Sequence, residues 1–310
     1  MHTLTTAFAL SLLLATRLAG QGVLGPDTVM VENDGLTLRG LLWRPAGMGP
    51  FPAILFNHGS GRTLAQLTAG GAGLRLGPLF AGRGYVFLML FRRGAGLSEH
   101  QGSVPGDTLT HEFAAHGVEA RNKLQLRLLE GSQLRDAMAG LTFLRARPDV
   151  DRRRLAVIGH SFGGALTLLM AERDSSLRAV VDFAGAANSW RYSPQLRERL
   201  RAAVRATVVP VFFIHAANDY SIAPGTELAA DMEAAHRPGR LRIYAAFGPT
   251  THEGHNFVFL DTKAWVPDVL AFLDQAMGRG RRRTTGLRVP SPATTPPAAS
   301  PAMGTHRGSL

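Results

Sequence analysis

The amino-acid sequence predicts an α/β fold in which a mostly parallel central sheet carries helices on both faces. Short, mostly apolar runs recur along the chain, as expected for strands that are buried on both faces; they cover residues 53–57, 85–90, 155–158, 179–183, 211–214 and 241–244. Segments with helical periodicity separate the later runs; they cover residues 132–147, 162–172, 195–206, 226–235 and 266–277. Alternation of strands and helices is typical of a parallel sheet.

The first expected strand differs from the others. Residues 36–43 alternate between apolar and polar side chains, and they follow the turn sequence Asn33-Asp34-Gly35. This pattern predicts an antiparallel strand at the edge of the sheet.

The composition excludes several classes of protein. Hydrophobic residues make up 45% of the 310 residues, which is enough for a compact core. The formal net charge is +11, but Arg17 and six arginines after residue 278 carry seven of these charges. No basic stripe with aromatic readers is left, so we expect no nucleic-acid partner. No segment reaches the roughly 18 apolar residues of a membrane span. The absence of cysteine excludes disulfides, a thiol nucleophile and thiolate metal sites.

The sequence divides into three parts. Residues 1–20 contain a short apolar run and resemble a signal peptide, so we expect export to the periplasm or the medium. The alternatives are a disordered leader or mis-assigned start, and a cytoplasmic location. Residues 21–278 are expected to form one α/β domain, in which residues 100–131 are an insertion that either caps the site or forms a surface element. Residues 279–310 are expected to be a disordered basic tail rich in Pro, Ser and Thr.

The candidate nucleophile is Ser161, in the sequence Gly159-His160-Ser161-Phe162-Gly163. This G-x-S-x-G motif follows an apolar strand and begins a helix, which is the context that a nucleophile at a sharp strand-to-helix turn requires. The helix directs its first backbone N–H groups toward developing negative charge. The alternative is a serine that only caps the helix.

A serine hydroxyl needs a base and a residue that orients the base. Asp219 follows the strand at residues 211–214, and His255 follows the strand at residues 241–244, so the order Ser, Asp, His is that of this type of site. Asp182 is the reserve candidate for the acid, and His252 competes with His255 as the base. Five other histidines are expected to be surface or core residues; they are His100, His111, His116, His215 and His236.

The oxyanion hole requires two backbone N–H donors. We expect one from Phe162, directly after the nucleophile, and the other from Ser60 in the glycine-rich segment at residues 57–61. The alternative for that segment is a simple glycine-rich connection. Trp190 and Tyr220 are the substrate-binding candidates, with core packing as the alternative for Trp190.

Together these motifs resemble the dienelactone hydrolase family of the α/β-hydrolase superfamily over about residues 28–278. The resemblance also rests on Arg92-Arg93-Gly94-Ala95-Gly96-Leu97-Ser98 and on Gly254-His255-Asn256-Phe257. The namesake enzymes have a cysteine nucleophile, whereas this chain has serine. The resemblance therefore implies an esterase for small-molecule esters that needs no metal and no cofactor, rather than an enzyme for dienelactone.

Other functions remain as alternatives. A peptidase or amidase of the same fold would use the same residues, and a hydrolase-fold protein can also act as a non-catalytic binding module. A dinucleotide-binding protein is not expected, because no strand leads into G-x-G-x-x-G. A metal hydrolase is not expected either, since His252 and His255 lack the i, i+4 spacing of helical metal ligands.

Overall fold

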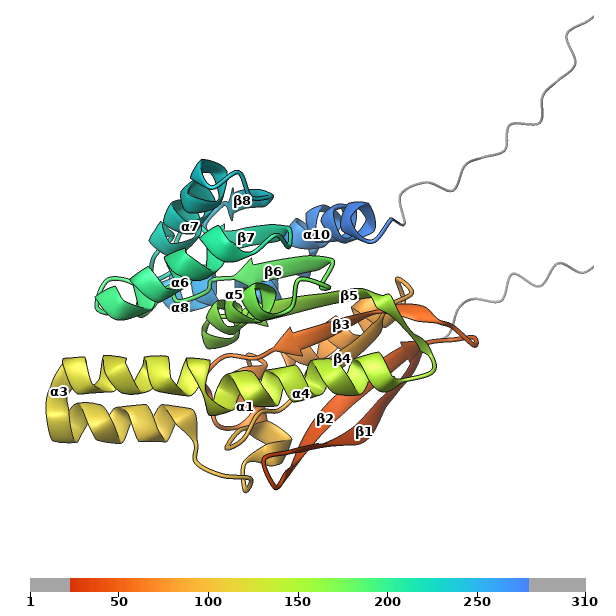
Figure 1. Cartoon of the computed structure of the whole chain (residues 1–310), viewed down its shortest axis with the longest axis horizontal. Coiled ribbons are helices and arrows are strands. Elements are labelled where there is room, and N and C mark those ends of the chain that lie inside the picture. Colours follow the sequence, from red (N-terminus) through yellow and green to blue (C-terminus); the bar gives the residue numbers. More distant parts are fainter. Residues whose placement is uncertain (1–22, 279–310) are drawn as a thin grey trace, which may run out of the picture. The chain divides into compact units, whose positions relative to one another are not determined.

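A computed structural model describes residues 23–278, which form an eight-stranded sheet with the order β1-β2-β4-β3-β5-β6-β7-β8 (Figure 1). The strands β3 to β8 are parallel, while β2 is antiparallel to both β1 and β4. The strands are β1 (Val23–Asn33), β2 (Leu36–Pro45), β3 (Phe51–Asn57), β4 (Val86–Leu90), β5 (Val150–His160), β6 (Ala179–Phe183), β7 (Val211–Ala216) and β8 (Gly239–Tyr244). The predicted α/β class and mostly parallel sheet are confirmed. The edge position predicted for residues 36–43 is wrong, because β2 lies between β1 and β4. The strand at residues 241–244 was expected to be buried on both faces, but β8 ends the sheet and has no buried residue.

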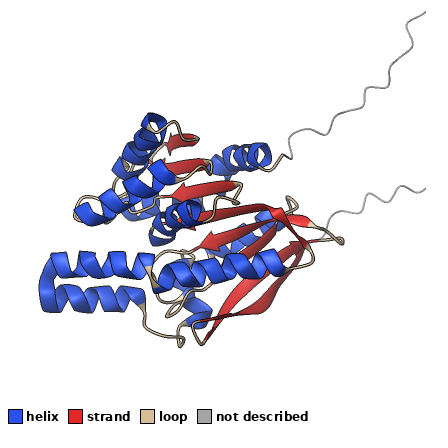
Figure 2. Cartoon of the chain, viewed as in Figure 1, coloured by secondary structure: helices blue, strands red, loops and turns tan. Residues whose placement is uncertain are grey.

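Helices connect the strands and cover the sheet (Figure 2). The longer ones are α3 (Pro105–Glu130), α4 (Ser132–Ala146), α5 (Phe162–Arg173), α6 (Pro194–Ala206), α7 (Ala223–Ala234) and α10 (Thr262–Ala276). The shorter ones are α1 (Leu64–Leu67), α2 (Leu76–Ala81), α8 (Thr251–His255) and α9 (Phe257–Leu260), with 3₁₀ turns η1 (Ala72–Arg75) and η2 (Gly96–Ser98). None of these helices is both long and apolar enough to cross a membrane.

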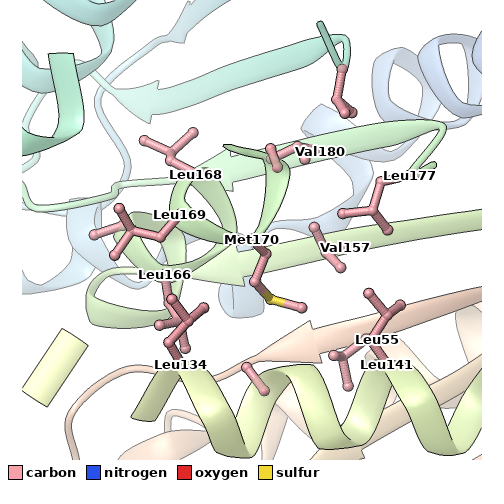
Figure 3. Close-up of a cluster of buried hydrophobic side chains, with 14 of the residues drawn as sticks. Leu55, Leu134, Leu141, Val157, Leu166, Leu168, Leu169, Met170, Leu177 and Val180 are labelled. Carbon is pink, nitrogen blue, oxygen red and sulfur yellow. The ribbon is translucent and has the colours of Figure 1, made fainter. Parts of the chain in front are cut away.

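The two faces of the sheet explain the continuous apolar runs. Leu55 and Val157 point to one face, where they pack against the helices α4 and α5 (Figure 3). Ile54 and Ile158 point to the other face, where the core includes Trp265 of α10. Because successive side chains of a strand point in opposite directions, a strand covered on both faces needs apolar residues at every position.

The insertion at residues 100–131 forms mainly the helix α3, which is interrupted at Gly117 with φ 79° and ψ −174°. Its two arms lie beside each other and extend past the carboxyl ends of β3 and β6 (Figure 1). The second arm is held by a hydrogen bond from Gln125 Nε2 to Ser189 Oγ at 3.1 Å, on the segment that follows β6. The insertion is therefore a helical hairpin, and its role as a cap stays a prediction. The expected leader and basic tail lie outside the described residues.

Candidate active site

Ser161 occupies the turn between β5 and α5. Its backbone has φ 58° and ψ −116°, a strained conformation for a residue with a side chain. A Cβ added at Gly163 would lie 2.0 Å from the backbone oxygen of Asn57, and one at Gly159 would lie 2.2 Å from the Gly163 oxygen. The glycines of the motif are therefore required because other backbone segments approach them closely.

Asp219 and His255 form a buried pair at the carboxyl end of the sheet. Asp219 follows β7, and its Oδ1 lies 2.7 Å from Nδ1 of His255, which ends α8. Burial raises the pKa of Asp219, but hydrogen bonds from His215 and His255 outweigh this effect and bring the pKa to about 2. The carboxylate is therefore ionised at neutral pH and accepts the Nδ1–H proton of His255, which leaves Nε2 as the free basic atom of that ring.

His160 connects the serine turn to this pair. Its Nε2–H donates to the backbone oxygen of His255 at 2.8 Å, and the centres of the two rings are 4.7 Å apart. Burial and, to a smaller extent, the neighbouring His255 lower the pKa of His160 to about 3, so the ring stays neutral at neutral pH. Since His160 precedes Ser161, this contact holds His255 close to the serine. Within residues 23–278, no hydrogen bond joins the Ser161 hydroxyl directly to His255.

A second histidine binds the same carboxylate. His215 is buried in β7, and its Nδ1 lies 2.8 Å from Oδ2 of Asp219. The backbone N–H of Tyr220 donates to Oδ1 at 2.7 Å. His215 is thus a core residue, which was one of the two expectations for it, but no sequence pattern indicated its contact with Asp219. With both oxygens engaged, the carboxylate has a fixed orientation toward His255.

Asp182 and His252, the two reserve candidates, are placed less favourably for catalysis. Burial raises the pKa of Asp182 to about 7, and neither of its carboxyl oxygens accepts a hydrogen bond of ordinary geometry from the described residues. His252 is exposed, and its ring nitrogens contact Tyr220 Oη at 3.4 Å and Asn256 Nδ2 at 3.3 Å rather than a carboxylate. The geometry therefore favours Asp219 over Asp182, and His255 over His252.

The two expected oxyanion donors flank the serine. Phe162 is buried at the first position of α5. On the other side, the segment with Ser60 passes close to the nucleophile, because a Cβ added at Gly59 would lie 3.7 Å from the Cβ of Ser161. Both candidate segments therefore lie beside Ser161, and the roles of Phe162 and Ser60 as oxyanion donors stay predictions.

Arg92 lies under the segment that carries Ser60, and the sequence did not reveal its position. Its side chain is 1% exposed, and its guanidinium donates to the backbone oxygens of His58 at 2.7 Å and Gly59 at 3.0 Å. Burial lowers the pKa of Arg92 to about 9, which leaves it charged at neutral pH. Only its place after an apolar strand could have suggested that this arginine is buried.

The two substrate-binding candidates lie in different environments. Trp190 is 2% exposed and belongs to the core cluster under α5 and α6, which favours the alternative of core packing. Tyr220 is 42% exposed, and its ring centre lies 4.8 Å from that of His255. Tyr220 is therefore next to the candidate base and accessible from solvent.

The described residues contain no group of three side chains arranged to hold a metal ion.

The fold and the arrangement of these residues define a hydrolase of the α/β-hydrolase fold. The chain belongs to the dienelactone hydrolase family, whose model matches residues 77–263, as the sequence motifs predicted.

Individual relatives are more distant. The quorum-quenching protein AidA of Acinetobacter baumannii (strain MDR-ZJ06) is 28% identical over 157 residues, which are 50% of this chain and 42% of that protein. This chain therefore matches less than half of that relative. A putative dienelactone hydrolase from Klebsiella pneumoniae has a TM-score of 0.58 at 18% identity, covering 82% of this chain and 99% of the other. The acylaminoacyl peptidase of Pyrococcus horikoshii has a TM-score of 0.56 at 17% identity, covering 80% and 41%. These two likenesses show the shared fold.

Proposed function

We propose that this protein hydrolyses carboxylic esters of small molecules through an acyl-enzyme on Ser161. The observation that carries the proposal is the buried Asp219–His255 pair, with a 2.7 Å contact, held by His160 next to a serine on a strained turn. Nucleophile, base and orienting acid then occur together with two backbone segments suited to an oxyanion.

The reaction follows from these positions. The Ser161 hydroxyl attacks the ester carbonyl while His255 takes its proton, and the N–H groups of Phe162 and Ser60 stabilise the oxyanion. The tetrahedral intermediate collapses, and His255 returns the proton to the departing alcohol. Water then attacks the acyl-enzyme while His255 takes a proton from that water. When the second tetrahedral intermediate collapses, His255 returns the proton to the Ser161 oxygen, and the carboxylic acid is released. Asp219 keeps its negative charge throughout and stabilises the imidazolium of His255.

Hydrolysis of p-nitrophenyl esters of increasing acyl length, with EDTA present, tests the proposal. We expect activity in the wild type and a kcat at least about 10³-fold lower in Ser161→Ala. Ser175→Ala is the matched control, because Ser175 is an exposed serine away from the turn. Full activity of Ser161→Ala, or loss of wild-type activity with EDTA, would contradict the mechanism. The acyl length with the highest kcat/KM would define the acyl site.

A further inference from the structure

Arg92 is a buried cation whose partners are neutral. Among residues 23–278, no carboxylate lies within salt-bridge distance of it, although Asp136 binds the neighbouring Arg93. Besides the two backbone oxygens, its Nε donates to Oε1 of Gln133 at 2.8 Å, and its Nη1 has no hydrogen-bond partner. Burying a charge without a counter-ion is costly, so a purely structural role would be served better by a neutral side chain.

The bonds of Arg92 fix the direction of the peptide that carries Ser60. In a planar trans peptide, the carbonyl oxygen and the following N–H point in opposite directions. Because the Gly59 oxygen points toward Arg92, the Ser60 N–H points away from it. In the same way, the bond from Arg92 to the His58 oxygen fixes the direction of the Gly59 N–H. A cation at the oxygen end also polarises the peptide and increases the partial positive charge on its N–H.

His58 supports the same arrangement. Its Nε2 accepts the backbone N–H of Arg92 at 3.1 Å, so the proton of the ring is on Nδ1. That Nδ1–H donates to the Gly59 oxygen at 2.8 Å. Burial and the nearby Arg92 lower the pKa of His58 well below its usual value, so the ring stays neutral. The Gly59 oxygen therefore accepts two hydrogen bonds, and both hold the following N–H in one direction.

Arg92 also contacts the other half of the site. Its guanidinium carbon lies 5.7 Å from the centre of the Phe162 ring, a cation–π contact. Phe162 supplies the second expected oxyanion donor through its backbone N–H. One buried side chain thus touches both segments whose N–H groups would meet the oxyanion.

We propose that Arg92 is a positioning residue of the oxyanion hole, which orients and polarises the Ser60 peptide from behind and holds Phe162 in place. This inference rests on the ester hydrolysis proposed above. An oxyanion exists in the transition state but not in the bound ester, so Arg92 acts on kcat rather than on KM.

The test compares Arg92→Met with Arg92→Lys, using a p-nitrophenyl ester and a trifluoromethyl ketone that forms a tetrahedral adduct with the serine. For Arg92→Met we expect kcat to fall about 10- to 100-fold, below the roughly 10²–10³-fold loss of a whole donor, with KM within about twofold. Inhibition by the ketone should weaken by the same factor as kcat/KM. Arg92→Lys keeps the charge, so its kcat should lie between those of the wild type and Arg92→Met. Arg93→Met is the control for loss of an arginine from the same segment, and its folded fraction should keep the wild-type kcat.

A change in KM alone, or unchanged inhibition by the ketone, would overturn the role of Arg92. If Arg92→Met does not fold, Gln133→Leu decides, since it keeps the cation and removes the bond to its Nε. We expect a drop in kcat of about three- to tenfold in that variant, and an unchanged kcat would overturn the proposal. An inactive wild type would overturn the ester hydrolysis itself, whereas an active wild type with insensitive variants would overturn only the role of Arg92.

Discussion

Substitution of Asp182 with asparagine distinguishes the roles of the two buried carboxyl groups of the site, because one of them is held neutral and the other is held ionised. Burial raises the pKa of Asp182 to about 7, whereas hydrogen bonds from His215 and His255 hold the pKa of Asp219 at about 2 against the effect of burial. The folded protein therefore favours a neutral Asp182 and an ionised Asp219. Asparagine has the shape of a neutral aspartic acid, so Asp182→Asn should preserve the folded site.

The magnitude follows from the shift in pKa. The pKa of Asp182 rises from 3.8 to about 7 on folding, which corresponds to about 4 kcal/mol. A raised pKa gives stability that is fully present below the unfolded value near 4 and is lost as the pH rises through about 7. Asp182→Asn does not lose this stability as the pH rises, because asparagine does not ionise. Relative to the wild type, its free energy of unfolding should therefore increase by about 4 kcal/mol between pH 4 and pH 8.

Urea unfolding at pH 4, 6 and 8 measures the difference, with ester hydrolysis at pH 8 as the second readout. Asp182→Asn should keep kcat within a few-fold of the wild type, whereas Asp219→Asn should lose about 10⁴-fold, the loss known for the equivalent change in a serine protease triad. Asp27→Asn, at a largely exposed aspartate, is the control for replacing an aspartate with asparagine. A constant difference in stability from pH 4 to 8, or a loss of activity in Asp182→Asn as large as in Asp219→Asn, would contradict a neutral Asp182 and an ionised Asp219.

Three further predictions concern the frame of the site. Gly163→Ala places a Cβ 2.0 Å from a backbone oxygen, so it should lower the unfolding free energy by at least about 3 kcal/mol in urea titrations; a neutral result would argue against this packing. Asp136→Ala leaves the mostly buried Arg93 without its bidentate partner, so it should lower the free energy of unfolding by about 3–5 kcal/mol. An unchanged thermal unfolding midpoint would contradict this. His160→Phe removes the bond to the His255 backbone and should lower the free energy of unfolding by about 1–2 kcal/mol. The pH profile of kcat should not change, because the pKa of about 3 keeps His160 neutral; a shifted profile would contradict a neutral His160.

The sequence predicts the sheet well where burial alone determines the pattern. The runs that became β3 to β7 are apolar at nearly every position because both of their faces are covered. By contrast, β1 was not predicted, since Gly25-Pro26 interrupts its pattern, and its pairing with β2 shifts register between Leu24 and Asp27. An edge strand with an irregular register leaves little periodicity to detect.

The candidate site was predictable where the motif is local. Ser161 and its glycines occupy consecutive positions, and Asp219 and His255 follow strands whose carboxyl ends meet at one edge. The contacts of His215 and Arg92 were not predictable, for two different reasons. His215 lies four residues from Asp219, but only the folded backbone determines that their side chains meet. Arg92 contacts His58, which lies 34 residues away in the sequence. Nothing in the sequence around residue 92 specifies that its guanidinium binds the His58 carbonyl.

The catalytic role of Ser161 can be measured directly by labelling the protein with a fluorophosphonate and mapping the modified peptide by mass spectrometry. Trypsin releases residues 155–173, in which Ser161 is the only serine. We expect stoichiometric modification of Ser161 in the wild type and labelling at least about 10³-fold slower in His255→Ala, because the serine then lacks its base. Modification of another residue, or labelling at the wild-type rate in His255→Ala, would contradict the catalytic role of Ser161.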